Sequence, residues 1–314
     1  MQSFLTTFVF FIIMGLGWLM KRRGTLTTAG LKDINALLFS LLMPISFFKT
    51  GVGFDPTMLH GWRYATVLLS AYVIFTGFTW VVSGIVHRKA PLRRAVSIIA
   101  TTRPNSIFLG VPLLALWAGQ AGTEAQLVYI AVCLPYFNAV PLFLAIFASS
   151  GKADARTLVR SLWNTLKSPI ILAGMLGILI GAMGWTHLIP DWATRTMNIL
   201  GGCGSGLALI VIGAALAPEN LRADISEAWP DMLLKLVLHP AAILIALVLF
   251  PMKDPVLMRC AVVATAIPPA FNCYMIARGF HMDSEYAADL VASTTLVSMV
   301  TLPIWMNVVS HIWL

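Results

Sequence analysis

The sequence predicts an all-α polytopic membrane protein, and three observations carry this prediction. Charged residues make up 11% of the chain and hydrophobic residues 59%, whereas about 25% of the residues of a soluble domain are charged. The mean hydropathy is +0.85. Proline interrupts two long apolar segments, at Arg103-Pro104-Asn105 and at Ile267-Pro268-Pro269, which are separated by about half of the 314-residue chain. Matching breaks in two halves are typical of membrane carriers and mark their binding sites.

Ten apolar segments are each long enough to cross a bilayer core of about 30 Å. They comprise residues 3–20, 31–50, 63–86, 93–118, 125–149, 167–184, 194–217, 229–250, 256–279 and 286–310. The first segment has no basic residue before it, and Lys21, Arg22 and Arg23 follow it. This order of charges predicts a spanning helix rather than a cleaved signal peptide. The sequence therefore predicts ten transmembrane helices joined by short loops.

The ten segments divide into two repeats of five. The first repeat comprises residues 1–150 and the second residues 167–314, and a polar cytoplasmic linker at 151–166 joins them. The proline breaks fall in the fourth and ninth segments, which are equivalent members of the two repeats. Because five is an odd number, the repeats must have opposite orientations in the membrane. We therefore expect an inverted repeat, as in many secondary carriers.

The distribution of lysine and arginine predicts that both termini lie outside the cytoplasm, on the periplasmic or extracellular side. Basic residues concentrate on the cytoplasmic side of membrane proteins. With the termini outside, the cytoplasmic set is Lys21, Arg22, Arg23, Lys32, Arg88, Lys89, Arg93, Arg94, Lys152, Arg156, Arg160, Lys167, Arg222 and Arg278, and the opposite set is Lys49, Arg63, Arg195, Lys253 and Arg259. Because the net charge of +8 is spread over short loops in this way, it does not indicate nucleic-acid binding.

Arg103 is the residue in the predicted spans with the clearest chemical consequence. It lies ten residues into its segment, which corresponds to a depth of about 15 Å. Arginine at that depth costs several kcal/mol unless it faces a cavity or a partner. Two interpretations stay open: a clamp for a ligand carboxylate, and a structural cap for carbonyls freed by Pro104. None of the 13 carboxylates lies at the centre of a span, which favours an anionic substrate.

Polar residues follow both breaks. Asn105 and Ser106 come after the first, and Asn272 comes after the second. Each can cap the half-helix that begins there or bind substrate oxygens. Asn138 is a weaker candidate, with hydrogen bonding between helices as its alternative. Because Ile267 takes the place of Arg103 in the second break, we expect an asymmetric site. The first break would supply charge, and the second mainly shape and amide donors.

Two further basic residues lie in the eighth segment. His239 is either a packing residue or a proton-coupling group, because imidazole changes charge near neutral pH. Lys235 lies about 9 Å from the segment end, close enough for us to expect an anchor that reaches the interface. The four cysteines form no C-x-x-C pair, and no nucleophile–base pair or cofactor fingerprint occurs. We therefore predict no metal, no cofactor and no enzymatic activity.

The residues after the breaks resemble those of the auxin efflux carrier family. Asn105-Ser-Ile-Phe108-Leu-Gly110-Val-Pro112 is similar to the N-x-x-F-x-G-x-P stretch of that family, and the second half carries Pro268-Pro269-Ala-Phe-Asn272. The resemblance implies a scaffold part from segments 1, 2, 6 and 7 and a moving transport part from segments 3–5 and 8–10, in which segments 4 and 9 cross. It also implies a homodimer and organic-anion substrates, including malonate-like dicarboxylates in bacterial members.

These observations together predict an inner-membrane secondary transporter of small organic anions that works by elevator-like alternating access. The absence of a long central loop favours a compact bacterial form of the resembled family. One alternative is an exporter of auxin-like monocarboxylates, although Arg103 favours a more strongly charged acid. Another is a substrate-gated anion channel or sensor, but the sequence has no charged pore ring. The predicted partners are the organic anion, the lipid bilayer and a second copy of the chain, and the coupling ion is a proton, sodium or none.

Overall fold

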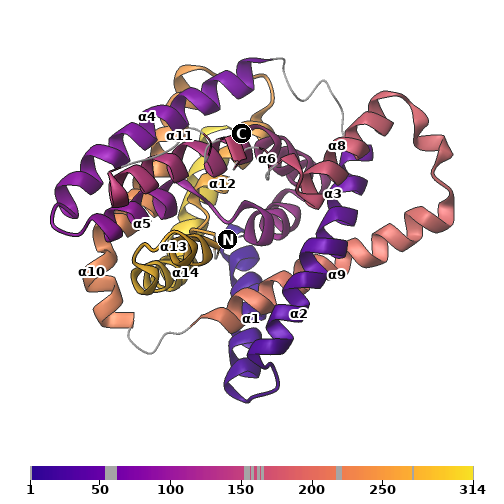
Figure 1. Ribbon diagram of the computed structural model, residues 1–314. Helices are drawn as coiled ribbons and strands as arrows, with labels where there is room; N and C mark the ends of the chain where they lie inside the picture. Colours follow the sequence, from indigo (N-terminus) through magenta and orange to yellow (C-terminus); the bar gives the residue numbers. More distant parts are fainter. Residues whose placement is uncertain are drawn as a thin grey trace. The chain divides into compact units, whose positions relative to one another are not determined.

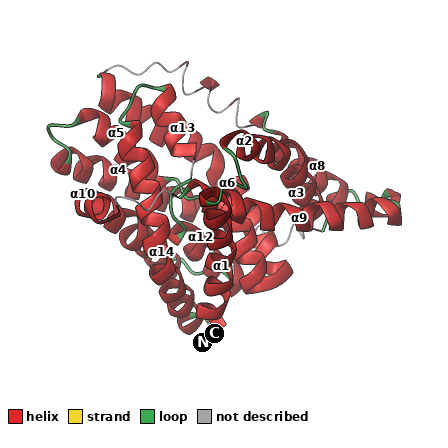
Figure 2. Ribbon diagram, turned by 90° about the horizontal axis from the view of Figure 1, so that it is seen from below, coloured by secondary structure: helices red, strands yellow, loops and turns green. Residues whose placement is uncertain are grey.

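The computed structural model describes residues 2–53, 62–151, 166–216, 221–270 and 272–313, together with the single positions 156, 159, 160 and 163. Within these ranges the chain is helical and contains no strand, so the predicted all-α class is confirmed (Figure 2). Most of the predicted linker at 151–166 lies outside the described residues.

Among the residues that the structure describes, six stretches of continuous helix are long and apolar enough to cross a membrane. These are Thr28–Val52, Trp62–Val86, Ser106–Ser150, Asp191–Ala215, Ile225–Leu249 and Ser284–Ile312. Two shorter apolar helices, Pro169–Ala182 and Pro255–Ala266, accompany them. The integral membrane character predicted from composition is therefore supported by helix length, while the number of ten crossings stays a prediction.

The chain separates into two compact units that each collect distant parts of the sequence. Unit 1 comprises residues 1–59, 107–131 and 164–216, and unit 2 comprises residues 60–106, 132–163 and 217–314. The helices of unit 1 are α1 (Gln2–Arg22), α2 (Thr28–Leu37), the π-helix η1 (Leu38–Leu42), α3 (Met43–Val52), α8 (Pro169–Ala182), the 3-10 helix η4 (Trp185–Leu188) and α9 (Asp191–Ala215).

The helices of unit 2 are α4 (Trp62–Val86), α5 (Pro91–Thr102), α10 (Leu221–Leu233), the π-helix η6 (Leu234–Leu238), α11 (His239–Leu249), α12 (Pro255–Ala266), α13 (Asn272–Gly279) and α14 (Ser284–Ile312). The π-helix η3 (Ser106–Gly110) and α6 (Val111–Ser150) contribute residues to both units. Gly119 in α6 has a φ of 62°, and this left-handed residue marks a kink between the fourth and fifth predicted segments.

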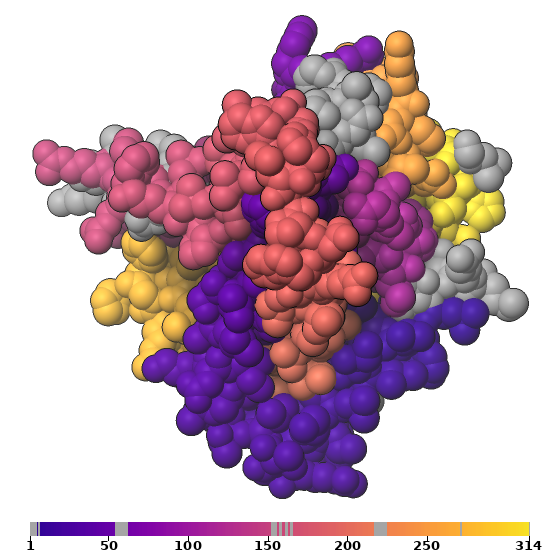
Figure 3. Space-filling view, turned by 90° about the vertical axis from the view of Figure 1, so that its right-hand side faces the viewer, coloured from indigo at the N-terminus to yellow at the C-terminus, as the bar shows by residue number. Residues whose placement is uncertain are grey.

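Glycine permits two close helix contacts in unit 1. Helix α1 packs against α9, and α3 packs against α8 (Figure 1). The orange-red atoms of α9 lie among the indigo and purple atoms of the N-terminal helices (Figure 3). A Cβ atom on Gly213 of α9 would lie 1.8 Å from the carbonyl oxygen of Met14, and one on Gly17 of α1 would lie 2.1 Å from that of Ile210. Such small-residue contacts are how helices approach closely in membranes.

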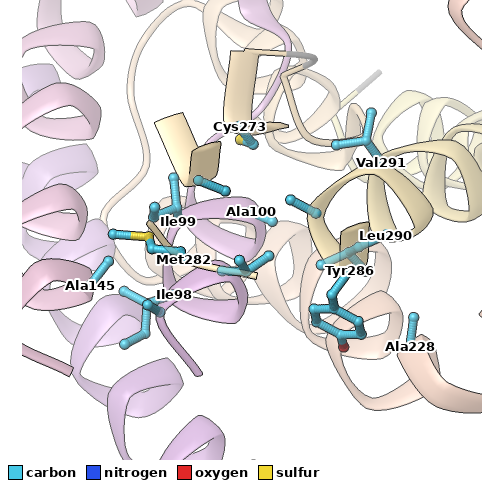
Figure 4. Close-up of a cluster of buried hydrophobic side chains, with 14 of the residues drawn as sticks. Ile98, Ile99, Ala100, Ala145, Ala228, Cys273, Met282, Tyr286, Leu290 and Val291 are labelled. Atoms are coloured by element: carbon cyan, nitrogen blue, oxygen red, sulfur yellow. The ribbon is translucent and has the colours of Figure 1, made fainter. Parts of the chain in front are cut away.

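Unit 2 is built around an apolar core to which both proline-broken segments contribute. Its buried residues come from α5, α6, α10, α13 and α14 (Figure 4). Ile98, Ile99 and Ala100 represent α5 in this core, and Cys273 represents α13. Because these residues immediately flank the two breaks in the chain, core packing holds the breaks in place.

The close contact between α1 and α9 leads to a prediction about thermal stability. We expect Gly213→Ala to lower the thermal midpoint of the purified protein, because the added methyl overlaps the Met14 carbonyl; such overpacking costs about 1–3 kcal/mol. Gly206→Ala in the same helix is the matched control, since no atom lies within 4 Å of its added Cβ. That variant should match or exceed the wild-type midpoint, because alanine favours helix. Equal midpoints for the two variants would contradict the close contact.

Candidate functional site

The two proline breaks lie side by side and pair through their backbones. Pro104 and Pro269 form an antiparallel bridge. The amide of Asn105 donates to the carbonyl of Pro268 at 2.9 Å, and the amide of Ala270 donates to the carbonyl of Arg103 at 3.1 Å. Two segments that are far apart in the sequence therefore meet at their interruptions.

Local sequence explains why the helices end at this point. Helices α5 and α12 are each 12 residues long, and each begins with a proline, Pro91 and Pro255. Arg103 and Ile267, which follow them, have extended backbones. The residue before a proline avoids the helical region, and proline has no amide hydrogen to donate. Pairing between the two breaks then satisfies backbone groups that a membrane interior would otherwise leave without partners.

Arg103 is buried and its charge is not compensated by a described carboxylate. Its exposed fraction is 6%. Among the described residues, its Nη1 atom has no hydrogen-bond partner, and none of the ion pairs involves its guanidinium. The structural-cap interpretation requires the guanidinium to donate to freed carbonyls, and the described residues provide no such hydrogen bond. An unpaired buried cation is costly, which makes Arg103 a candidate ligand-binding residue.

Lys235 serves as the cap instead, and the sequence-based expectation of an interfacial anchor is wrong. Its side chain is fully buried, and Nζ donates to the carbonyl of Thr265 at 3.1 Å, near the end of α12. A cation at the carboxyl end of a helix is favoured by the helix dipole. Depth along the chain suggested that Lys235 could reach the interface, but η6 packs against both α5 and α12 and holds this residue in the interior. The position of this lysine within an apolar segment was the feature of the sequence that could have indicated its burial.

His239 lies one turn beyond Lys235 and is fully buried. Its ring stacks on Phe75 at a centroid distance of 4.4 Å and meets the edge of Tyr72 at 4.9 Å. The Nζ atom of Lys235 is 3.3 Å from Nδ1 of His239. Because an ammonium group only donates hydrogen bonds, Nδ1 is the acceptor and therefore carries no proton. We call Arg103, Lys235 and His239 the cationic cluster.

The predicted polar candidates differ in position. Asn105 and Ser106 are buried at the first break, and the hydroxyl of Ser106 donates to the carbonyl of Pro104 at 3.4 Å. Asn272 begins α13 and is exposed. Asn138 is half-buried in α6, where its amide donates to the carbonyl of Leu134 at 3.0 Å. The structure thus brings Asn105 and Ser106 to the paired breaks with Arg103, while Asn138 donates a hydrogen bond within its own helix.

The arrangement is suited to attracting an anion. The Arg103 carbonyl accepts from the amide of Ala270, and Lys235 donates to the carbonyl of Thr265 near the end of α12, so both cationic residues lie beside the second break of unit 2. His239 beside them is a neutral donor through Nε2, which has no hydrogen-bond partner among the described residues. A bound carboxylate would satisfy these groups with charge-assisted hydrogen bonds. Within the described ranges, no group of three or more His, Cys, Asp or Glu side chains is placed to hold a metal ion.

Comparison with known proteins places the chain among membrane transporters. The family described as "Membrane transport protein" matches residues 4–306. The "Uncharacterized transporter YfdV" of Escherichia coli (strain K12) is 24% identical over 302 residues, which cover 95% of this chain and 94% of that protein. The "Putative malonate transporter" of Rhizobium meliloti (strain 1021) is 24% identical over 297 residues, which cover 93% of this chain and 91% of that protein.

The buried charge of Arg103 leads to a prediction about stability. We expect Arg103→Met to raise the thermal midpoint of the ligand-free protein, because an apolar side chain of similar length removes the desolvation cost of an unpaired buried charge, which is several kcal/mol per ion. Arg93→Met is the control: Arg93 pairs with Glu227 and Asp283 near the surface, so its loss should leave the midpoint unchanged or lower it. A lower midpoint for Arg103→Met would show that the guanidinium has a structural partner.

Proposed function

The chain belongs to the membrane transport protein family, and from this membership we propose that it is a secondary transporter of small organic anions. Its resemblance to auxin efflux carriers is confirmed by the family match across the chain. Family and relatives describe transporters rather than enzymes. The substrate class proposed here is the malonate-like dicarboxylates, in agreement with the printed name of the Rhizobium meliloti relative.

The observation that carries this proposal is the pair of buried cations at the crossing. Arg103 and Lys235 are both buried, and neither forms an ion pair with a carboxylate among the described residues. A dicarboxylate carries two negative charges and could neutralise both cations, whereas a monocarboxylate would leave one unpaired. Interiors tolerate charge when it is paired and hydrogen-bonded. A dianionic substrate therefore fits the cluster better than the auxin-like monocarboxylate does.

The proposed mechanism is elevator-like alternating access with unit 2 as the moving transport part. Unit 2 holds the crossing and the cationic cluster, and unit 1 contains the residues of predicted segments 1, 2, 6 and 7, which supports their assignment to the scaffold. Residues 107–131, from segments 4 and 5, also belong to unit 1. The family resemblance instead implies that both segments lie wholly in the moving transport part. The boundary between the proposed parts therefore passes through these two segments.

Helix contacts support the proposed inverted repeat. If segment 1 corresponds to segment 6 and segment 2 to segment 7, a contact between segments 1 and 7 has a counterpart between segments 6 and 2. Helix α1 does contact α9, and α3 contacts α8. In unit 2, contacts of α4 with α5 correspond to those of α11 with α12. Each of these four contacts thus has an equivalent in the other half, as expected for a pseudo-two-fold axis.

The proposed roles of the site residues follow from their positions. Arg103 would clamp one substrate carboxylate, and Asn105, Ser106, Asn272 and Asn138 would contribute hydrogen bonds to substrate oxygens. Pro104, Pro268 and Pro269 would keep both segments interrupted, and His239 stays a candidate proton-coupling group. A homodimer in the bacterial inner membrane, with both termini on the periplasmic side, remains part of the proposal.

Transport in proteoliposomes tests the clamp. We expect Arg103→Ala to fold, as judged by size-exclusion chromatography, but to lose malonate uptake and malonate-induced thermal stabilisation. Arg103→Lys should retain partial uptake, because lysine keeps the charge without the bidentate geometry. Arg195→Ala, an exposed arginine of α9, is the control and should transport normally. Uptake unchanged in Arg103→Ala would eliminate the clamp, and single-channel currents in the wild type would favour a channel instead.

Substrate charge provides a second test. We expect Lys235→Met to weaken malonate binding by about 10–100-fold, because a hydrogen bond to a charged group is worth about 1.5–3 kcal/mol. Binding of a monocarboxylate such as acetate should change much less, since Arg103 alone can neutralise it. Isothermal titration calorimetry of both ligands with the folded variant measures the difference. An equal loss for the two ligands would argue against Lys235 as a ligand for the second carboxylate.

A further inference from the structure

A second buried polar network lies in unit 2, away from the crossing. Asp231 of α10 is fully buried, and three side chains from other parts of the unit surround its carboxylate. Ser97 of α5 donates to Oδ1 at 2.7 Å, and the hydroxyl of Tyr286 of α14 donates to Oδ2 at 2.7 Å. The Nε2 atom of His87, which follows α4, lies 3.0 Å from Oδ2. Two hydroxyl donors and an imidazole nitrogen thus surround the carboxylate, a setting that suits an ionised acceptor when His87 donates from Nε2.

The charge of this network depends on one proton. Neutral His87 can donate from Nε2 to Asp231, and protonated His87 donates from the same atom. The hydrogen bond therefore survives in both states, while the net charge of the pair changes from −1 to zero. His87 is 8% exposed and is followed by the exposed residues Arg88 and Lys89. The imidazole therefore lies just beneath the surface of unit 2.

The network is linked to the cationic cluster by one helix. Asp231, Lys235 and His239 are spaced four residues apart along the continuous helix α10–η6–α11, and all three are fully buried. Residues at this spacing lie on one face of a helix, about 6 Å apart along its axis. In a buried setting, a charge on the His87–Asp231 pair therefore acts on the cationic cluster and on any anion bound to it.

We propose that the His87–Asp231 pair is a proton-binding site whose proton favours anion binding at the cationic cluster, an inference that rests on the proposed function. When His87 is neutral, the pair carries −1 and repels the anion. When His87 is protonated, the pair is neutral and the repulsion disappears. By linkage, anion binding then increases proton binding by the same factor. Proton and anion occupy the protein together, as coupled transport requires.

Other charged or titratable groups lie on the elements near the His87–Asp231 pair and add to the local electrostatic potential. They are Arg88 and Lys89 after α4, Arg93 and Arg94 in α5, Glu227 and Lys235 in the α10–η6 helix, His281 before α14, and Asp283, Glu285 and Tyr286 at the start of α14. Arg93 pairs with Glu227 at 2.7 Å and Asp283 at 3.1 Å, and it lies 5.0 Å above the Tyr286 ring, which borders the apolar core (Figure 4). Imidazole is the side chain of this set whose charge ordinarily changes between about pH 5 and 8.

His239 is a less suitable proton site than His87. Its Nδ1 atom already accepts from Lys235, so protonation there would place two like charges 3.3 Å apart. Two nearby like charges disfavour each other. At His87 the added charge instead meets a carboxylate at 3.0 Å. Geometry therefore distinguishes the two histidines, and variants of each can be compared directly.

The test measures malonate affinity and proton uptake with the purified full-length chain in detergent between about pH 6.5 and 8, the upper part of the range in which imidazole ordinarily changes charge. Wild-type affinity should rise about tenfold as the pH falls, because two unit charges about 12 Å apart interact by that factor at an effective dielectric constant of 20. Malonate binding in weak buffer should take up protons. Malonate is present mainly as the dianion over this range, so the proton uptake reports the protein.

Two variants should change malonate affinity in opposite directions. His87→Gln keeps a donor for Asp231 and fixes the pair at −1, so its malonate affinity should be weak and independent of pH. Asp231→Asn removes the negative charge, so its affinity should be tight while His87 stays neutral, and proton uptake at neutral pH should disappear. His281→Asn, at an exposed histidine of the same unit, is the control and should behave as the wild type.

Three outcomes would overturn the proposed coupling between proton and anion binding. Wild-type binding of malonate without pH dependence or proton uptake would overturn this inference and leave the proposed function intact. If malonate affinity still depends on pH in His87→Gln but not in His239→Gln, the inference would also be overturned. The proton would then be assigned to His239. No binding of malonate by the wild type at any pH would overturn the proposed substrate class and this coupling with it.

Discussion

The pairing of the two interrupted backbones is the constraint on which the rest of unit 2 depends. Two amide–carbonyl hydrogen bonds join the strand-like residues around Pro104 to those around Pro269. Each break supplies what the other lacks, because proline removes donors and leaves carbonyls exposed. Once the breaks are fixed to each other, the ends of α5 and α12 converge. Side chains placed near these ends, such as Arg103 and Lys235, then share one small region.

Convergence of the helix ends explains why the region holds cations. The carboxyl ends of helices carry partial negative charge, which favours a positive group such as Lys235. That partial charge offsets one full charge only in part, and Arg103 adds a second. The ligand-free protein therefore retains buried positive charge, a costly arrangement that structural needs alone do not explain. Such unfavourable groups occur mainly at functional sites. An anion that pairs with the buried cations would offset their desolvation penalty, and this would contribute to the free energy of binding.

Sequence alone predicted the helical class and the two breaks because both arise from local chemistry, apolar composition and proline. It also singled out Arg103, which the structure shows to be buried, because its position ten residues into an apolar segment follows from counting residues. It misjudged Lys235, because side-chain direction at a π-helix depends on packing with α5 and α12 rather than on distance from the helix end. It gave no warning of the His87–Asp231 pair, whose members are far apart in the chain and meet only through tertiary contacts.

The two halves of the chain supply charge to the paired breaks in different ways. Arg103 and Ile267 occupy equivalent positions after helices of equal length, yet one is a cation and the other a buried apolar residue. The expectation that the first break supplies charge and the second mainly shape and amide donors stays a prediction. Lys235, from a neighbouring helix of the second half, places its ammonium group against Thr265, two residues before Ile267. Each half of the chain thus contributes one cation, and the two come from different elements, Arg103 from the first break and Lys235 from η6.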